Sequence, residues 1–127
     1  MKQNLTLTIA SLFTLVLTTF HFTHDILHDS DGLTNGETSI LLAIALVMLY
    51  ATVELAGRRL GYVILLLGGA AAAYMPYLHS MGPRATRWGF FFVWTMFVMG
   101  VSGTFTAILS ARALWRSFRA RSSSPLA

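Results

Sequence analysis

The 127-residue sequence contains no cysteine, and only 11% of its residues are charged. The absence of cysteine excludes disulfides, thiolate metal sites, cysteine-bound iron–sulfur clusters and cysteine nucleophiles. The scarcity of charge excludes an ordinary soluble domain, in which about 25% of residues are charged. Phosphate-binding loops, dinucleotide fingerprints, serine-elbow motifs and the multi-histidine pattern of membrane hydroxylases are also missing. The sequence is instead 55% hydrophobic with a mean hydropathy of +0.64, which is typical of a membrane protein.

The hydrophobic residues form four runs, each long enough to cross a bilayer, which takes roughly 20 apolar residues. The predicted spans are about 5–27, 39–57, 60–78 and 88–111. The first run resembles a secretory signal, but no small-residue cleavage site follows it, so we interpret it as a retained span. Thr34 and Glu37 match the capping-box pattern just before the second span. The sequence therefore predicts an all-α, polytopic membrane protein: a single domain, 1–127, with a compact bundle of four transmembrane helices and a basic flexible tail, 112–127.

Basic residues are concentrated on one side of the four predicted spans. That side holds Lys2, Arg58, Arg59, Arg112, Arg116, Arg119 and Arg121, and the other side holds Arg84 and Arg87. Because Lys and Arg near span ends remain in the cytoplasm, this imbalance predicts a multi-pass protein of the cell membrane with both termini cytoplasmic. The four histidines are then expected at the outer face. Since the basic residues lie at span ends rather than on one patch, the expected partner is the lipid bilayer and not a nucleic acid.

Small residues in the third and fourth predicted spans indicate how the helices pack. Gly103, Ala107 and Ala111 recur at four-residue spacing, and the segment 68–73 contains only Gly and Ala. Such faces let helix backbones approach closely in lipid, which favours a compact bundle. Pro76 is expected to kink the third span or to free a backbone carbonyl. The aromatic residues of 88–94 are interpreted as an interfacial anchor.

A stripe of small and polar residues runs along one face of the first predicted span. On a helical wheel at about 100° per residue, His21, His24 and His28 fall within an arc of about 60°, and Asp25 lies beside them. The stripe continues back along the span through Thr6, Ala10, Ser11, Thr14 and Thr18. Because lipid satisfies no hydroxyl group, the stripe is expected to face the interior of the bundle.

The outer end of this stripe has the spacing of a metal site. Histidines at i and i+3 or i+4 converge on one helix face, as in helix-borne metal sites. His79 of the third span is expected at the same membrane depth. The predicted metal ligands are His21, His24, His28, His79 and Asp25. Nitrogen and oxygen donors suit Zn, Cu(II) or non-haem Fe better than Cu(I). A structural interpretation stays open, in which the stripe only packs and the cluster is the hydrated end of a span.

Three functional hypotheses follow. The leading one is an accessory or structural subunit of a larger membrane complex, or a homo-oligomer, that carries the metal site, because a 14.0-kDa chain is small for a complete transporter or multi-step enzyme. The second is a metal- or haem-binding redox protein, in which His21 or His24 would ligate haem together with His79. No catalytic residue is identified, and enzyme activity is not expected.

The third hypothesis is a small oligomeric ion or proton conductor, which needs ionisable groups along its path. Deep in the predicted spans only Glu54 qualifies. Arg58 follows four residues later, which is the favourable order for a Glu–Arg pair on a helix. Glu54 and Arg58 are therefore predicted to form an intramembrane ion pair that snorkels toward the cytoplasm.

Overall fold

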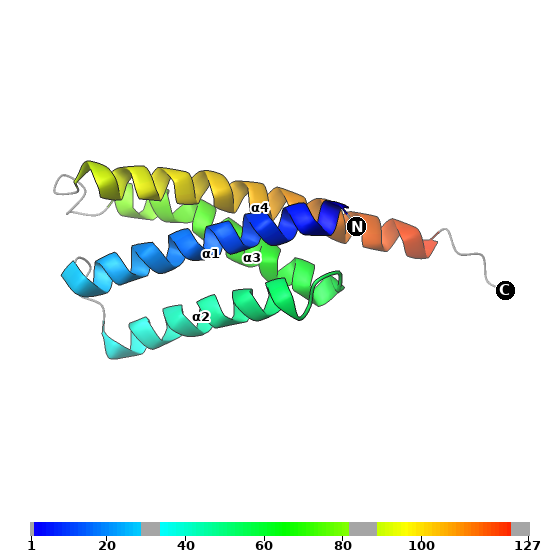
Figure 1. The fold of residues 1–127 in the computed structure, drawn as a ribbon, viewed down its shortest axis with the longest axis horizontal. Coiled ribbons are helices and arrows are strands. Elements are labelled where there is room, and N and C mark those ends of the chain that lie inside the picture. The colour runs from blue at the N-terminus through cyan, green and yellow to red at the C-terminus, as the bar shows by residue number, and fades with distance from the viewer. Residues whose placement is uncertain (1, 29–33, 82–88, 123–127) are drawn as a thin grey trace.

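The computed structural model describes residues 2–28, 34–81 and 89–122, which form four helices joined into one bundle (Figure 1). The helices are α1 (Lys2–His28), α2 (Asn35–Val53), α3 (Arg59–Ser80) and α4 (Phe90–Ser122). Each is long and apolar enough to cross a membrane. The predictions of an all-α fold and of four potential membrane-spanning helices are therefore confirmed.

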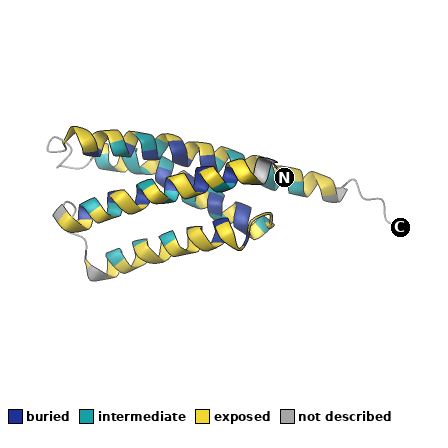
Figure 2. Ribbon diagram, viewed as in Figure 1, coloured by how far each residue is buried: buried dark blue, intermediate teal, exposed yellow. Residues whose placement is uncertain are grey.

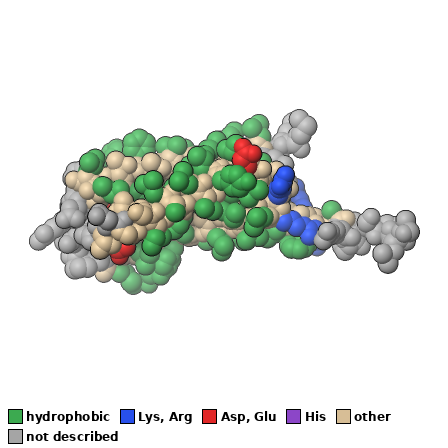
Figure 3. All heavy atoms as spheres, turned by 90° about the horizontal axis from the view of Figure 1, so that it is seen from below, with side chains coloured by type: hydrophobic (Ala, Val, Ile, Leu, Met, Phe, Trp, Pro, Cys, Tyr) green, Lys and Arg blue, Asp and Glu red, His purple; other side chains and the backbone are tan. Residues whose placement is uncertain are grey.

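The two ends of the bundle differ in chemistry. One end carries Arg58, Arg59, Arg112, Arg116 and Arg119, and we call it the basic end. Figure 3 shows Lys and Arg side chains gathered toward one end of a surface rich in hydrophobic side chains. The opposite end, which we call the histidine end, carries His21, His24 and His79. Of the other charged residues used to predict orientation, Asp29, Asp31, Arg84 and Arg87 lie outside the described residues.

The helix boundaries differ most from the predicted spans in α2 and α4. α2 begins directly after Thr34, whose hydroxyl accepts a hydrogen bond from the Glu37 amide at 3.3 Å, while the Thr34 amide donates to Glu37 Oε2 at 2.8 Å. The predicted capping box is therefore present. α4 continues to Ser122, so the predicted flexible tail is helical over 112–122, and residues 123–127 lie outside the described residues.

The extension of α4 is held by contacts with the start of α3. The Arg59 guanidinium donates a hydrogen bond to the Ser117 carbonyl and lies 4.6 Å from the centre of the Phe118 ring. At about 1.5 Å per residue, a helix of 33 residues is longer than the roughly 30 Å of a hydrocarbon core. The last turns of α4 therefore extend past the other helices at the basic end, as Figure 1 shows.

A seam of buried residues on α1 and on α4 repeats every seven residues. It comprises Leu7, Ser11, Thr14, Thr18, His21 and Asp25 in α1, and Phe92, Met96, Met99, Gly103, Thr106 and Ser110 in α4, where Gly103 contacts α3. Both sets alternate steps of four and three, which is the spacing of knobs-into-holes packing. The predicted stripe is thus buried from Ala10 to Asp25, apart from His24, which is partly exposed. Thr6 is exposed and Leu7 is buried in its place. The helical wheel assumes about 3.6 residues per turn, whereas the buried residues recur every 3.5 residues on average, so the two faces diverge along the helix.

Apolar and polar layers alternate along the bundle. An apolar cluster at the basic end contains Leu7, Ala51, Leu55, Tyr62 and Leu65, and a second one toward the histidine end contains Ala72, Phe92, Met96 and Met99. Between them, Thr14 and Thr106 are fully buried and their hydroxyls lie 3.0 Å apart. Thr14 donates to the Ala10 carbonyl at 2.9 Å, so the Thr106 hydroxyl is the donor between the two threonines. This bond joins α1 to α4 inside the bundle.

α3 and α4 approach each other at two glycines. A Cβ atom added to Gly103 would lie 2.7 Å from the Ala73 nitrogen and 2.7 Å from the Gly69 oxygen. A Cβ atom added to Gly69 would lie 2.8 Å from the Ala107 nitrogen. The prediction of a small-residue contact is correct for Gly103 and Ala107, whereas Ala111 is exposed. The close contact therefore pairs two Gly-xxx-Ala segments.

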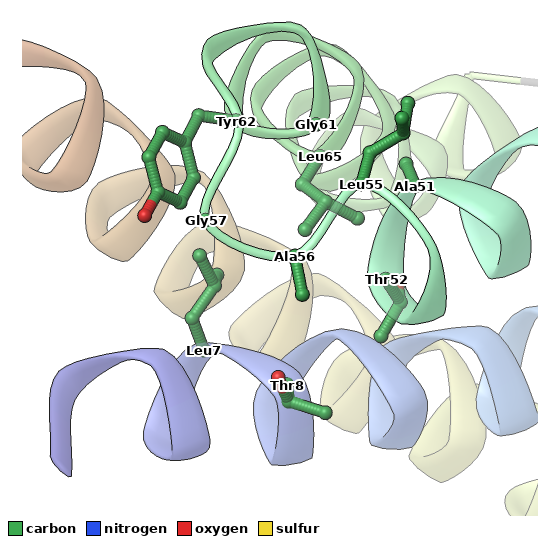
Figure 4. Close-up of a pocket in the computed structure, with 10 residues that line it drawn as sticks. All are labelled: Leu7, Thr8, Ala51, Thr52, Leu55, Ala56, Gly57, Gly61, Tyr62 and Leu65. Atoms are coloured by element: carbon green, nitrogen blue, oxygen red, sulfur yellow. The ribbon is translucent and has the colours of Figure 1, made fainter. Parts of the chain in front are cut away.

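α2 is the least buried helix. Figure 2 shows most of its length as exposed, whereas buried residues concentrate between α1, α3 and α4. Its buried side chains, Met48, Ala51 and Thr52, lie in the half near the basic end. In the turn that follows, Leu55 packs in one cluster with Leu7 of α1, and the turn lines a pocket together with Leu7 and Thr8 (Figure 4). α2 is therefore anchored mainly at the basic end.

The predicted pair of Glu54 and Arg58 lacks the helical geometry on which it depended. α2 ends at Val53, Glu54 caps it, and Arg58 is extended where it caps α3. Gly57, between them, has a φ of 84°, which reverses the chain direction. Both side chains are exposed, and the ion pairs found among the described residues do not include them. The prediction is corrected: these residues lie in an exposed turn at the basic end.

Candidate metal centre

Three side chains from two helices meet at the histidine end. His21 and Asp25 are four residues apart, so they lie one above the other on the buried seam of α1. His79 comes from the last turn of α3, three residues after Pro76. α3 is continuous through Pro76. The ring of Pro76 packs closely on Gly100 of α4, since a Cβ atom added to Gly100 would lie 2.8 Å from the Pro76 ring. This packing holds the end of α3, and with it His79, against the bundle.

The three side chains are close together, and two of them are buried. His21 Nε2 lies 3.2 Å from Asp25 Oδ2, and His79 Nε2 lies 4.0 Å from the same oxygen. One possible ligand atom from each residue lies within 4.8 Å of the other two. The exposed fractions are 2% for His21, 4% for Asp25 and 12% for His79. A carboxylate with this little solvent requires a positive charge or hydrogen-bond donors beside it.

The backbone of α3 sets the tautomer of His79. Its Nδ1 lies 3.1 Å from the Met75 carbonyl oxygen, and a carbonyl only accepts hydrogen bonds. Nδ1 is therefore the donor, and in the neutral ring Nε2 carries the lone pair, directed to the side where Asp25 lies. Metal-binding histidines commonly donate their second ring nitrogen to a carbonyl in this way, which orients the ring and raises its basicity.

Phe92 of α4 packs beside the cluster. Its ring centre lies 5.3 Å from that of His21, 4.8 Å from that of His24 and 6.1 Å from that of His79. Phe92 is itself buried. An apolar wall of this kind lowers the local dielectric, which strengthens any electrostatic bond to the carboxylate.

The spacing fits a single small ion. At bond lengths of about 2.1 Å, two ligands of a tetrahedral zinc ion lie about 3.4 Å apart. The 3.2 Å between His21 and Asp25 already meets this requirement. His79 must approach Asp25 by about 0.6 Å, and the widest separation among the three donors, at most 4.8 Å, must shorten by up to about 1.4 Å. Two imidazoles and one carboxylate occupy three positions of such an ion and leave a fourth open.

A haem does not fit between His21 and His79 as they stand. Their ring centres are only 4.8 Å apart and the rings are nearly perpendicular. Two imidazoles that ligate one haem iron from opposite faces require ring centres about 6 Å apart, with the macrocycle between them. The geometry of this pair therefore favours a single ion over a haem.

The predicted ligands divide into three groups. His21, Asp25 and His79 come together. His24 Nδ1 lies 3.7 Å from the other carboxylate oxygen of Asp25, and its side chain is 35% exposed, so His24 lies at the edge of the cluster. His28 is the last residue of α1, and its side chain lies outside the described residues. Phe92 was not predicted, because an aromatic residue in the run 90–92 carries no sequence signal of a site.

This arrangement can hold a divalent cation in a site from which bulk water is largely excluded. The ion would take the place of the proton between His21 Nε2 and Asp25 Oδ2, so its binding releases protons. Comparison of the chain with protein-family models, curated proteins and solved structures finds no match.

Proposed function

We propose that this small multi-pass membrane protein binds one divalent transition-metal ion, with Zn²⁺ as the first candidate, through His21, Asp25 and His79. One observation carries the proposal: three donors from two helices, two of them buried and the third, His79, partly buried, converge within 4.8 Å of one another. The orientation of His79 by the Met75 carbonyl supports it, because it directs Nε2 toward Asp25.

The same geometry also fits a purely structural role without a metal ion, and the test must distinguish the two. A protonated histidine beside Asp25 would also neutralise the buried carboxylate and tie α1 to α3. The two interpretations differ in stoichiometry, because only the first places a metal ion in the purified protein. The donor set also occurs in non-haem Fe(II) sites, so the identity of the ion is part of the test.

The test is a metal titration of the purified full chain in detergent. After chelator treatment, we expect the protein to bind one Zn²⁺ per chain, and Co²⁺ to give the intense visible absorption of a tetrahedral site. His79→Gln should abolish the Co²⁺ spectrum while the helical circular dichroism is retained. Zinc binding absent from the folded wild-type protein would refute the proposal, and iron in place of zinc would reassign the ion.

We also propose that the histidine end faces the outside and that both termini are cytoplasmic. The concentration of arginines at the basic end supports this orientation. Since the chain has no cysteine, single cysteines can report it directly. In intact cells, Gly89→Cys should react with a membrane-impermeant maleimide, and Ala120→Cys should react only after the membrane is permeabilised. The opposite pattern would reverse the orientation.

The conductor hypothesis finds less support than metal binding. The Thr14 and Thr18 hydroxyls donate to carbonyls of their own helix, and an apolar cluster that includes Leu7 and Leu65 closes the basic end. The expectation of a homo-oligomer or of a subunit in a larger complex stays a prediction. Cross-linking of the protein in native membranes, followed by identification of the products, tests it.

A further inference from the structure

An apolar groove lies between α1 and α4 at the histidine end. Its outer edges are formed by Phe20 and Leu27 of α1 and Phe91 of α4, and deeper in it lie His21, His24 and Phe92. The groove encloses about 570 Å³, including the space at its open side. Because His21 belongs both to the groove and to the metal cluster, the groove borders the candidate metal site at this residue.

The groove opens along the flanks of two helices that can each cross the membrane. Phe20 is 62% exposed, and Leu27 and Phe91 are each 74% exposed, so apolar side chains form the entrance. A ligand dissolved in the lipid can enter sideways, whereas a strongly hydrated one must first lose its water. The entrance therefore selects a molecule with a long apolar part.

The groove offers few polar groups to a ligand. Thr23 and Thr95 line it, but their hydroxyls donate to the carbonyls of Thr19 and Phe91 at 2.8 Å. The imidazoles at the inner side are the principal polar groups. A matching ligand therefore has one polar head directed toward the histidines and an otherwise apolar body.

The charge of the loaded site determines the kind of head group. Neutral His21 and His79, an ionised Asp25 and a divalent ion sum to a net charge of +1. A net charge in a site of low dielectric is unfavourable, and a monoanion neutralises it. Three protein ligands also leave a fourth coordination position for an oxygen donor. We infer that the groove binds a long-chain fatty acid, whose carboxylate completes the coordination of the metal ion. This inference rests on the proposed metal binding.

The test compares a fluorescent polyene fatty acid with its methyl ester on the wild-type protein, with and without Zn²⁺. We expect Zn²⁺ to strengthen binding of the acid by at least about tenfold and to leave binding of the ester unchanged, because only the acid offers an anionic donor. Thr95→Trp, which fills the groove, should weaken binding of the acid and preserve Zn²⁺ binding. The matched control is Thr104→Trp, an exposed position on the same helix, which should change neither.

The outcomes separate this inference from the proposal on which it rests. If Zn²⁺ binds but the acid does not, or if acid and ester bind alike, the fatty-acid site is refuted and the metal site stands. If the folded wild-type protein does not bind Zn²⁺, both fail. The comparison on the wild-type protein decides the matter even if Thr95→Trp does not fold.

Discussion

Gly103→Ala is expected to destabilise the bundle, because the added methyl group collides with backbone that cannot rotate away. The new Cβ would lie 2.7 Å from the Ala73 nitrogen and the Gly69 oxygen. α3 and α4 must then separate locally, and overpacking of this kind costs about 1–3 kcal/mol. Alanine is the better helix former by about 1 kcal/mol, so the measured loss is a lower limit on the steric cost.

Reversible unfolding in mixed detergent micelles, followed by circular dichroism, measures this effect. Gly69→Ala should behave similarly, since its Cβ would meet the Gly103 oxygen at 2.8 Å. Gly89→Ala is the matched control, because nothing lies within 4 Å of a Cβ atom at Gly89. Equal stability of the Gly103 and Gly89 variants would show that α3 and α4 are not in close contact.

Asp25→Asn is expected to lower Zn²⁺ affinity by more than about 100-fold. Loss of a residue that only hydrogen-bonds to a metal ligand lowers affinity by about 10–100-fold, and loss of a ligand itself should cost more. Asparagine keeps the size of the side chain but removes the anionic oxygen that lies nearest to both His21 and His79. His24→Gln serves as the control, since His24 is at the edge of the cluster, and should change the affinity by less than about tenfold.

Competition with a chelating dye measures both affinities, and thermal unfolding provides a second measurement. At a free Zn²⁺ concentration of 100 times Kd, binding stabilises the wild-type protein by about 2.7 kcal/mol. The Asp25→Asn variant should lose this zinc-dependent shift and keep its helical content. A larger loss of affinity for His24→Gln than for Asp25→Asn would mean that the ion sits on the other side of the carboxylate.

Features that depend on a single helix, and not on its neighbours, could be predicted from the sequence. Four spans follow from the lengths of the hydrophobic runs, and the capping box at Thr34 follows from residue identity and spacing. His79 was correctly placed near His21, because four spans in alternating directions bring the end of the first and the end of the third to the same side. The helical wheel likewise identified the buried stripe from Ala10 to Asp25.

What depends on a partner helix could not be predicted. His21 and His24 share one arc of the wheel, and only the position of α3 and α4 decides that His21 is buried and His24 partly exposed. The separation of Glu54 from Arg58 depends on a glycine at positive φ, which spacing alone does not reveal. The contribution of Phe92 depends on which face of α4 turns inward, and that is decided by the glycine contact with α3.

The buried bond between Thr14 and Thr106 has a consequence for the far end of the molecule. It defines the axial register of α1 against α4, since only one alignment pairs the two hydroxyls. A slip of one turn, about 5.4 Å, would separate the Thr14 and Thr106 hydroxyls and lift His21 away from Phe92. Two turns of helix separate Thr14 from His21, so a hydroxyl pair deep in the bundle sets the height at which the imidazole meets His79.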